Sequence, residues 1–354
     1  MTKFILCIIS FTWVCHSSFA QLNVRKLSIH NEQGGISFPI FSSSTNAKAA
    51  NKINDFLQMN VADQTTAKVP EKDLFKDIMY QATNTNLNSY MESLSYEIPT
   101  NRKEMVSIYL HGTTMSAYPD FFESTYNFNS TTGDIIYIED LFTIDGLKQL
   151  QRYIRDQRKR LMEQHLQTIK KDNDLMTDLG PDGIIHLQDE FNTCVSYFTY
   201  SDFFIEHDSL HFISPRCLPH SELPLDGEFP VSIAIQDWKN SLNSYGQKLL
   251  IEKSIVSNAY HANFYHRPLY GSIGKIPIVI YIDEPSESVN GFYYYPSQGI
   301  RINFFGSFSN NLLHVQANAT DNPALKETIK ATLSSNGLKG EWSQGAKKLP
   351  FVAN

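Results

Sequence analysis

The sequence predicts an α+β fold: a mixed, mostly antiparallel sheet packed with helices, followed by a small all-β antiparallel sheet or barrel. Three observations indicate this. Apolar residues recur at helical spacing near the N-terminus, alternate at strand spacing from residue 104, and form short strand-like runs in the last third. The 23 Phe and 18 Tyr residues are typical of an ordered, strand-rich protein.

The first residues have the pattern of a secretory leader. Lys3 precedes an apolar stretch over 4–14, and Ser18 and Ala20 stand three and one positions before Gln21. A cationic start, an apolar run too short to cross a bilayer and small residues before a cut are typical of a signal peptide. We expect cleavage after Ala20 and a secreted or periplasmic protein, with a buried N-terminal helix as the alternative.

Cleavage would remove Cys7 and Cys15 and leave Cys194 and Cys217. In an oxidising compartment these two cysteines are candidates for one disulfide, worth about 3 kcal/mol. Two unpaired buried thiols are the alternative, because a sequence does not give the distance between two Cα atoms. Lipid attachment at Cys15 is disfavoured because small residues do not precede it.

The formal net charge of −7 disfavours nucleic acid as a partner, since phosphate binding needs clustered Lys and Arg. An acidic surface favours encounter with a basic protein instead. After the leader no stretch has the ~20 continuous apolar residues of a membrane helix, so no membrane span is expected.

The N-terminal segment predicts a strand followed by two helices. The strand covers 36–41 and contains Pro39, which suits an edge strand. One helix follows it directly, and a second begins at Glu71, where apolar residues again share helical spacing.

The middle of the chain predicts alternating strands around one long helix. A turn that ends at Gly133 joins two of the strands, and Asp145 is placed to cap a helix that runs to about Lys171. The expected strands are 105–110, 123–129, 134–138, 196–205, 210–214 and 229–235, and a short helix covers 236–242.

The C-terminal part predicts a compact antiparallel sheet or small barrel, because short strands alternate with Gly, Asn and Pro-Ser turns. The expected strands are 275–283, 289–295, 300–305, 312–317, 338–342 and 349–352. The expected organisation is a signal peptide (1–20), a strand-helix segment (21–100), an α+β domain (101–246), a linker (247–268) and a small all-β domain (269–354).

Several short motifs occur in an order that resembles one known family. They are Phe128-Asn129, Thr132-Gly133, Ile138-Glu139-Asp140-Leu141-Phe142, Phe203-Phe204-Ile205, Leu210-His211-Phe212, Leu218-Pro219-His220 and Val231-Ser232-Ile233. Together they resemble the DUF3298 domain of RsiV-type anti-sigma factors, which also stands beside some peptidoglycan deacetylase domains. Upstream, Phe38-Pro39-Ile40 and Asn51-Lys52-Ile53-Asn54 resemble the DUF4163-like segment that precedes it. The resemblance covers about residues 30–245.

The resemblance implies a mixed sheet with helices, no catalytic role for the domain itself and, in the RsiV-type members, binding of lysozyme, a basic protein. Two loops depart from the family pattern. Where members often have Gly-Gly-Ala-His-Pro, this chain has Tyr118-Pro119, and where they have Ala-Pro-Tyr it has Pro219-His220. These four residues are candidate partner-binding positions.

The sequence contains few motifs that indicate catalysis or the binding of a metal or cofactor. His207, His211, His261 and His266 do not form a His-Glu-x-x-His arrangement, and no Gly-rich phosphate loop is present, so no metal and no cofactor are expected. The acidic pair Glu139-Asp140 is explained by helix capping.

The aromatic run 292–295 predicts a strand whose two faces each carry two rings. Tyr293 and Tyr295 are candidates for contact with a sugar or a protein, because tyrosine has an apolar ring and a hydrogen-bonding tip. Packing across strands is the alternative for the same residues.

These observations favour an exported, non-catalytic binding protein of the cell envelope, which recognises a basic, lysozyme-like protein or a cell-wall glycan. A peptidoglycan or polysaccharide hydrolase with carboxylates from several loops is one alternative. A structural envelope protein is the other.

Overall fold

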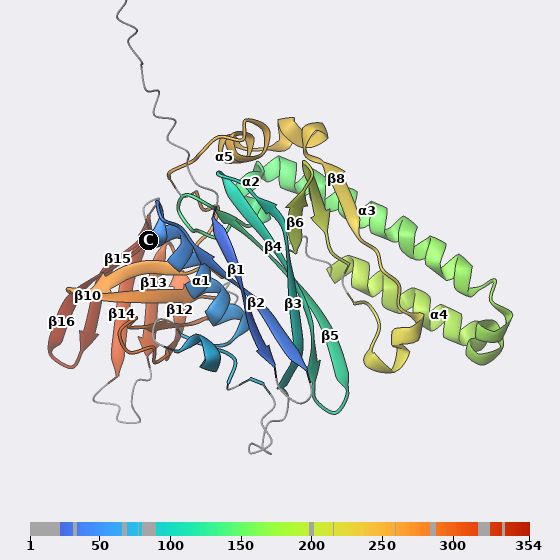
Figure 1. The fold of residues 1–354 in the computed structure, drawn as a ribbon, viewed down its shortest axis with the longest axis horizontal. Coiled ribbons are helices and arrows are strands. Elements are labelled where there is room, and N and C mark those ends of the chain that lie inside the picture. The colour runs from blue at the N-terminus through green and yellow to red at the C-terminus, as the bar shows by residue number, and fades with distance from the viewer. Residues whose placement is uncertain are drawn as a thin grey trace, which may run out of the picture.

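The computed structural model describes residues 22–30, 34–65, 69–76, 78–79, 90–197, 202–214, 216–258, 260–283, 288–317, 326–334 and 337–354. The expected signal peptide lies outside these residues. In Figure 1 a five-stranded sheet stands between a closed barrel on one side and a projecting helical hairpin on the other. No helix in the described ranges is long and apolar enough to cross a membrane.

The first sheet is mixed. Its strands are β1 (Asn23–His30), β2 (Gly35–Ser42), β3 (Tyr90–Asn101), β4 (Met105–Met115) and β5 (Pro119–Asn129), in that spatial order. All neighbours are antiparallel except β2 and β3, which are parallel and pair at Ile36 and Leu94. The strand with Pro39 was expected at the edge, but β1 takes that place. Pro39 is accommodated because β2 has only this short pairing with β3.

Helix α1 (Ala47–Val61) covers one face of the sheet. The Asn46 side chain caps its N-terminus, and Ile53, Phe56 and Leu57 are buried against the sheet, as their spacing predicts. The prediction of a second helix from Glu71 is wrong. In the described residues 69–76 and 78–79, one 3₁₀ turn forms at η1 (Glu71–Asp73), and the apolar residues after it, such as Phe75, are buried in the same core.

The middle of the chain builds a second, smaller sheet beside the first. Its elements are α2 (Ile138–Leu141), α3 (Ile144–Ile169), α4 (Asn173–Tyr197), β6 (Phe203–Glu206), β7 (Ser209–Phe212), η2 (His220–Leu225), β8 (Val231–Ala234), η3 (Ile235–Ser241), α5 (Ser244–Gly246) and η4 (Gln247–Ile251). Strands β6, β7 and β8 form an antiparallel meander, with His207 and Asp208 at positive φ in the first turn. Residues 134–138, expected to form a strand, make only a bridge from Ile135 to Phe128.

The C-terminal part is a closed barrel of eight antiparallel strands, whose first strand pairs with the last. The strands are β9 (Leu269–Ile273), β10 (Ile276–Ile282), β11 (Val289–Tyr294), β12 (Ile302–Ser309), β13 (Leu312–Ala317), β14 (Glu327–Ser334), β15 (Gly337–Gln344) and β16 (Lys347–Ala353). Alternating side chains fill its interior with an apolar core. A mixed sheet with helices followed by a small barrel confirms the predicted fold class.

A buried ion pair ties the barrel to the rest of the chain. Arg267, just before β9, contacts Asp140 of α2 at 3.1 Å, and both side chains are at most 1% exposed. The Asp140 carboxylate also accepts hydrogen bonds from the backbone N–H groups of Ala262 (2.7 Å) and Tyr137 (2.9 Å). Asp140 therefore has a structural role at the junction, in addition to the helix capping that its position predicts.

Candidate binding groove

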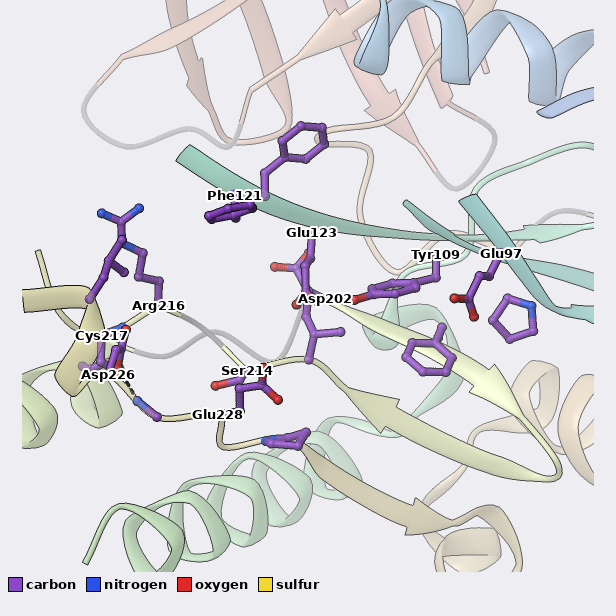
Figure 2. A pocket seen from close by; sticks show the side chains of 18 of the residues that line it. Glu97, Tyr109, Phe121, Glu123, Asp202, Ser214, Arg216, Cys217, Asp226 and Glu228 are labelled. Carbon is purple, nitrogen blue, oxygen red and sulfur yellow. Dashed lines mark hydrogen bonds between the residues drawn. A yellow bond between two sulfur atoms is a disulfide. The ribbon is translucent and has the colours of Figure 1, made fainter. Parts of the chain in front are cut away.

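A cavity of about 1040 Å³ lies on the sheet face opposite α1 (Figure 2). Strands β3, β4 and β5 form one side, β6 forms the floor, and α4 closes one end. The other side is the segment between β7 and β8, here called the wall segment (residues 216–230). We refer to the whole cavity as the acidic groove.

Carboxylates dominate the charged side chains that line the acidic groove. They are Glu97, Glu123, Glu190, Asp202, Glu206, Asp226 and Glu228, and the cation among the lining residues is Arg216. Within the described part of the chain, none of these seven carboxylates forms an ion pair with Lys or Arg; Arg216 pairs with Asp120 instead. Unbalanced negative charge of this kind raises the free energy of the fold and attracts an external cation.

Strand alternation explains why the acids gather here. Glu97 of β3 lies opposite Tyr109 of β4, and Glu123 of β5 lies opposite His111 of β4, so these side chains share one sheet face. The Tyr109 hydroxyl donates a hydrogen bond to the Glu123 carboxylate. Burial, this hydrogen bond and the nearby charges of Glu123, Glu97 and Glu228 raise the pKa of Tyr109, so it stays a neutral donor.

Aromatic rings extend from the same face. The Tyr109 ring lies 5.6 Å from the His111 ring and 5.5 Å from the Phe204 ring, and Phe204 stacks on His211 at 4.9 Å. At the β5 side of the groove, the Phe121 side chain is 73% exposed. Carboxylates beside aromatic rings suit Lys and Arg side chains, because rings and carboxylates both attract cations.

Asp202 differs electrostatically from the other groove acids. Its side chain reaches solvent, yet the surrounding residues desolvate the carboxyl group and raise its pKa, an effect that the charge of Arg158 partly offsets. Arg158 of α3 is fully buried beneath the wall segment. It donates hydrogen bonds to the backbone carbonyls of Phe229 (3.1 Å) and Ile213 (2.6 Å), which hold both ends of the segment.

A disulfide fastens the wall segment to the helical hairpin. Cys194 of α4 and Cys217 are bonded, with their Cα atoms 5.3 Å apart. Both cysteines are half-buried and line the acidic groove.

A crystal structure of a DUF3298 family member from Bacteroides fragilis matches 63% of this chain and 94% of its own length, with 14% identity and a TM-score of 0.41. A DUF3298 family protein from Pseudomonas aeruginosa matches 63% of this chain and 95% of its own, with 11% identity and a TM-score of 0.38.

Part of this chain therefore matches DUF3298 structures. Both matched structures are of the family that the sequence motifs resemble, and the C-terminal part of the chain lies outside the match. No protein-family model matches the chain, and no curated protein does.

Two predicted partner-binding loops of the DUF3298-like part meet in space. The exposed Tyr118 ring, in the β4–β5 connection, lies 5.1 Å from the His220 ring at the start of η2. Pro119 and Pro219 stand beside them, and Asp120 pairs with Arg216 of the groove lining. The predicted loops thus adjoin the acidic groove, although their own four residues do not line it.

The other two predicted partner-binding residues lie in the barrel. Tyr293 is 0% exposed and donates a hydrogen bond to Glu327, and Tyr295 packs against the barrel core at the edge of the Tyr293 ring. The opposite face of this strand is also covered, because Tyr294 packs against Met59 of α1. Cross-strand packing thus accounts for the aromatic run, and Tyr293 has no surface to offer a partner.

The acids of the acidic groove were not among the predicted site residues. They come from β3, β5, α4, β6 and the wall segment, so no local motif contains them. The signal that was present is alternation: Glu97, Tyr109 and Glu123 occupy same-face positions of three strands. In the described ranges, no cluster of three or more His, Cys, Asp or Glu side chains is arranged to hold a metal ion.

Proposed function

We propose that this chain is a non-catalytic binding protein of the cell envelope whose acidic groove docks a basic protein. The observation that carries the proposal is seven carboxylates around a cavity of about 1040 Å³ with Arg216 as the lining cation. The exposed rings of Phe121 and Tyr118 beside the cavity supply apolar contact area. A lysozyme-like protein is the partner class that the sequence resemblance suggests.

The charge also ranks the two partners expected from the sequence. A basic protein gains attraction from every unpaired carboxylate, while a glycan gains only ring stacking and hydrogen bonds. The basic protein is therefore the favoured occupant of the groove.

Calorimetric titration with a basic lysozyme, near neutral pH and at low salt, tests the proposal. Replacing two exposed groove acids, Glu97→Gln with Glu228→Gln, should weaken binding roughly tenfold, and a similar loss should follow from raising the salt to about 0.5 M. The matched control, Glu163→Gln with Glu252→Gln, removes the same charge from exposed positions outside the groove lining and should bind as the parent does. Equal losses in both variants, or no binding at low salt, would count against the proposal.

One observation favours the hydrolase alternative. Glycoside hydrolysis uses a carboxylic acid of raised pKa with a second carboxylate, and Asp202 has a raised pKa within the acidic groove. Turnover of labelled cell wall that disappears in Asp202→Asn would favour the hydrolase. If neither turnover nor lysozyme binding is measured, the structural-protein alternative gains support.

A further inference from the structure

The wall segment supplies much of one side of the acidic groove. Its lining residues are Arg216, Cys217, Leu223, Asp226, Gly227, Glu228 and Pro230. The segment belongs to the long connection between β7 and β8, and its position sets where two of the seven groove carboxylates stand. Any change in its position changes the width and the charge of the groove.

The two ends of the wall segment are fastened differently. Near β8, Phe229 is buried, its carbonyl accepts a hydrogen bond from Arg158, and its N–H donates to Ser214 at 2.8 Å. Near β7, Cys217 is bonded to Cys194 of α4, and Leu218 packs into the α3–α4 core. The disulfide is thus a covalent tie between the β7 end of the wall and the helical hairpin.

Weaker contacts add to the attachment, among them the Arg216–Asp120 ion pair to β5 and the Tyr118–His220 ring contact. His165 of α3 lies 2.9 Å from the Leu225 carbonyl, and His186 of α4 lies 3.3 Å from Glu222. The Asp226 carboxylate accepts hydrogen bonds from the N–H groups of Cys217 and Leu218, which folds the wall segment on itself. The histidine contacts join the segment to its surroundings through single polar groups, some of them exposed, and such contacts contribute little each.

We propose that the Cys194–Cys217 disulfide is a redox control on the acidic groove. Oxidised, it holds the wall segment against α4 in the geometry that binds a cationic partner; reduced, it leaves the β7 end of the segment held by noncovalent contacts alone and so more mobile. This inference rests on the proposed function, because the groove is the site it regulates. Both cysteines are half-buried residues of the groove lining, so their disulfide borders a cavity that a small dithiol can enter.

The chemistry of release is thiol–disulfide exchange. A thiolate of a dithiol reductant attacks one sulfur, and the Cys194–Cys217 bond breaks as a mixed disulfide forms. The second thiol of the reductant then displaces the protein sulfur and closes its own disulfide. Two electrons and two protons pass from the dithiol to the protein, which is left with two cysteine thiols.

Reduction should loosen the wall without unfolding the chain. Helices α3 and α4 stay packed together through buried apolar residues, among them Met162, Phe191 and Phe229. The mixed sheet and the barrel have cores of their own. The expected change is confined to the groove.

Affinity for a basic lysozyme, measured for the oxidised and the dithiothreitol-reduced protein, tests the control. We expect roughly tenfold weaker binding after full reduction, because the free wall must be ordered again on binding. The double variant Cys194→Ser with Cys217→Ser should bind as weakly as the reduced protein and should not respond to dithiothreitol. Unchanged affinity after complete reduction, verified by thiol titration, would overturn the proposal.

Hydrogen exchange of the wall segment gives a readout that needs no partner. Amides of 216–228 should exchange faster in the reduced protein and in the double variant, while amides of β4 and β10 should not change. If no basic protein binds the oxidised chain but the wall still loosens, the proposed function fails and the redox clamp stands. Equal exchange in both redox states would overturn the clamp.

Discussion

At the scale of single residues, the buried Asp140–Arg267 ion pair stabilises the fold. Asp140 and Arg267 are both almost fully buried, and the Arg267 guanidinium also lies 4.9 Å from the centre of the Tyr137 ring. Burial raises the pKa of Asp140, while Arg267 and two backbone N–H groups lower it. A carboxylate so enclosed cannot reach a substrate, so Asp140→Asn is a test of folding and is uninformative about cell-wall hydrolysis.

We predict that Asp140→Asn destabilises the protein by about 3–5 kcal/mol, because Arg267 keeps its charge in a buried site without a counter-ion. Urea unfolding followed by fluorescence measures this loss. The exposed Asp145→Asn serves as the control. Thr143, and not Asp145 as expected from the sequence, caps α3, so this change should alter the unfolding free energy by less than about 1 kcal/mol. Near-equal values for the two variants would contradict the structural role of Asp140.

Asp55 of α1 links pH to stability. It lines a second cavity, about 650 Å³, together with Lys52, Asp134, His261 and Tyr270. Burial raises the pKa of Asp55 from 3.8 to about 6. The folded state therefore holds this proton more tightly than the unfolded chain does, and the associated stability is present below about pH 4 and lost as the pH rises through about 6.

We predict that Asp55→Asn is more stable than the parent protein by about 1–2 kcal/mol near neutral pH, because the variant has no carboxylate to desolvate. Near pH 3 the advantage should largely vanish, since Asp55 is then mostly protonated in both the folded and the unfolded state. Unfolding free energies at the two pH values measure the difference. A constant difference between the two proteins would show that Asp55 titrates normally.

At the residue scale, composition and local context predict some features and miss others. The expected removal of Cys7 and Cys15 left Cys194 and Cys217 as the candidates for a disulfide, and the structure joins them. Glu97, Glu123 and Glu228 gave no local signal, because each stands alone in its segment. The pairing of β3, β4 and β5 brings Glu97 and Glu123 to one sheet face, and the wall segment places Glu228 beside them.

At the element scale, helix α3 positions the wall segment of the groove through Arg158. Arg158 sits at a buried position of the helix, and desolvation lowers its pKa to about 9, which leaves it charged at neutral pH. Its two hydrogen bonds hold carbonyls on either side of the wall segment. Through Arg158, helix α3 thereby holds the wall segment in a fixed position.

We predict that Arg158→Met lowers the unfolding free energy by about 2–4 kcal/mol, because two buried carbonyls lose their donors. Lysozyme affinity should fall as well, since the wall segment loses its anchor. Arg155→Met, one turn away on the exposed face of the same helix, should change neither quantity measurably. Parent-like unfolding of Arg158→Met would contradict the anchoring role.

Helices and strands were predicted correctly where the spacing of apolar residues followed one helical or strand period without a break. The alternation in 105–110 and 123–129 became parts of β4 and β5, and the long periodic stretch after Thr143 became α3. Helix α4 was missed because Gly180, with φ of 63°, and Pro181 suggest a break, and the structure has a kink there with helix on both sides. Strands β1, β3, β9 and β14 were also missed, and each is stabilised mainly by its neighbours in a sheet.

At the scale of the whole molecule, charge is unevenly placed. The chain carries a formal net charge of −7, and seven carboxylates line one cavity. The net charge of the sequence indicated a basic partner. The proposed binding surface could be located only once the fold showed which carboxylates line one cavity. The barrel contacts α1 through Tyr281 and Tyr294, on the side of the first sheet that is opposite the groove.

The most direct measurement of the central claim is a carboxylate footprint of the complex. The protein is labelled with a water-soluble carbodiimide and an amine, alone and with saturating basic lysozyme, and the modified residues are identified by mass spectrometry. The account predicts that bound lysozyme protects Glu97, Glu123 and Glu228, while the exposed Glu163 and Glu252 remain labelled. Saturated lysozyme with unchanged labelling of the three groove acids would show that the partner docks elsewhere, and would contradict it.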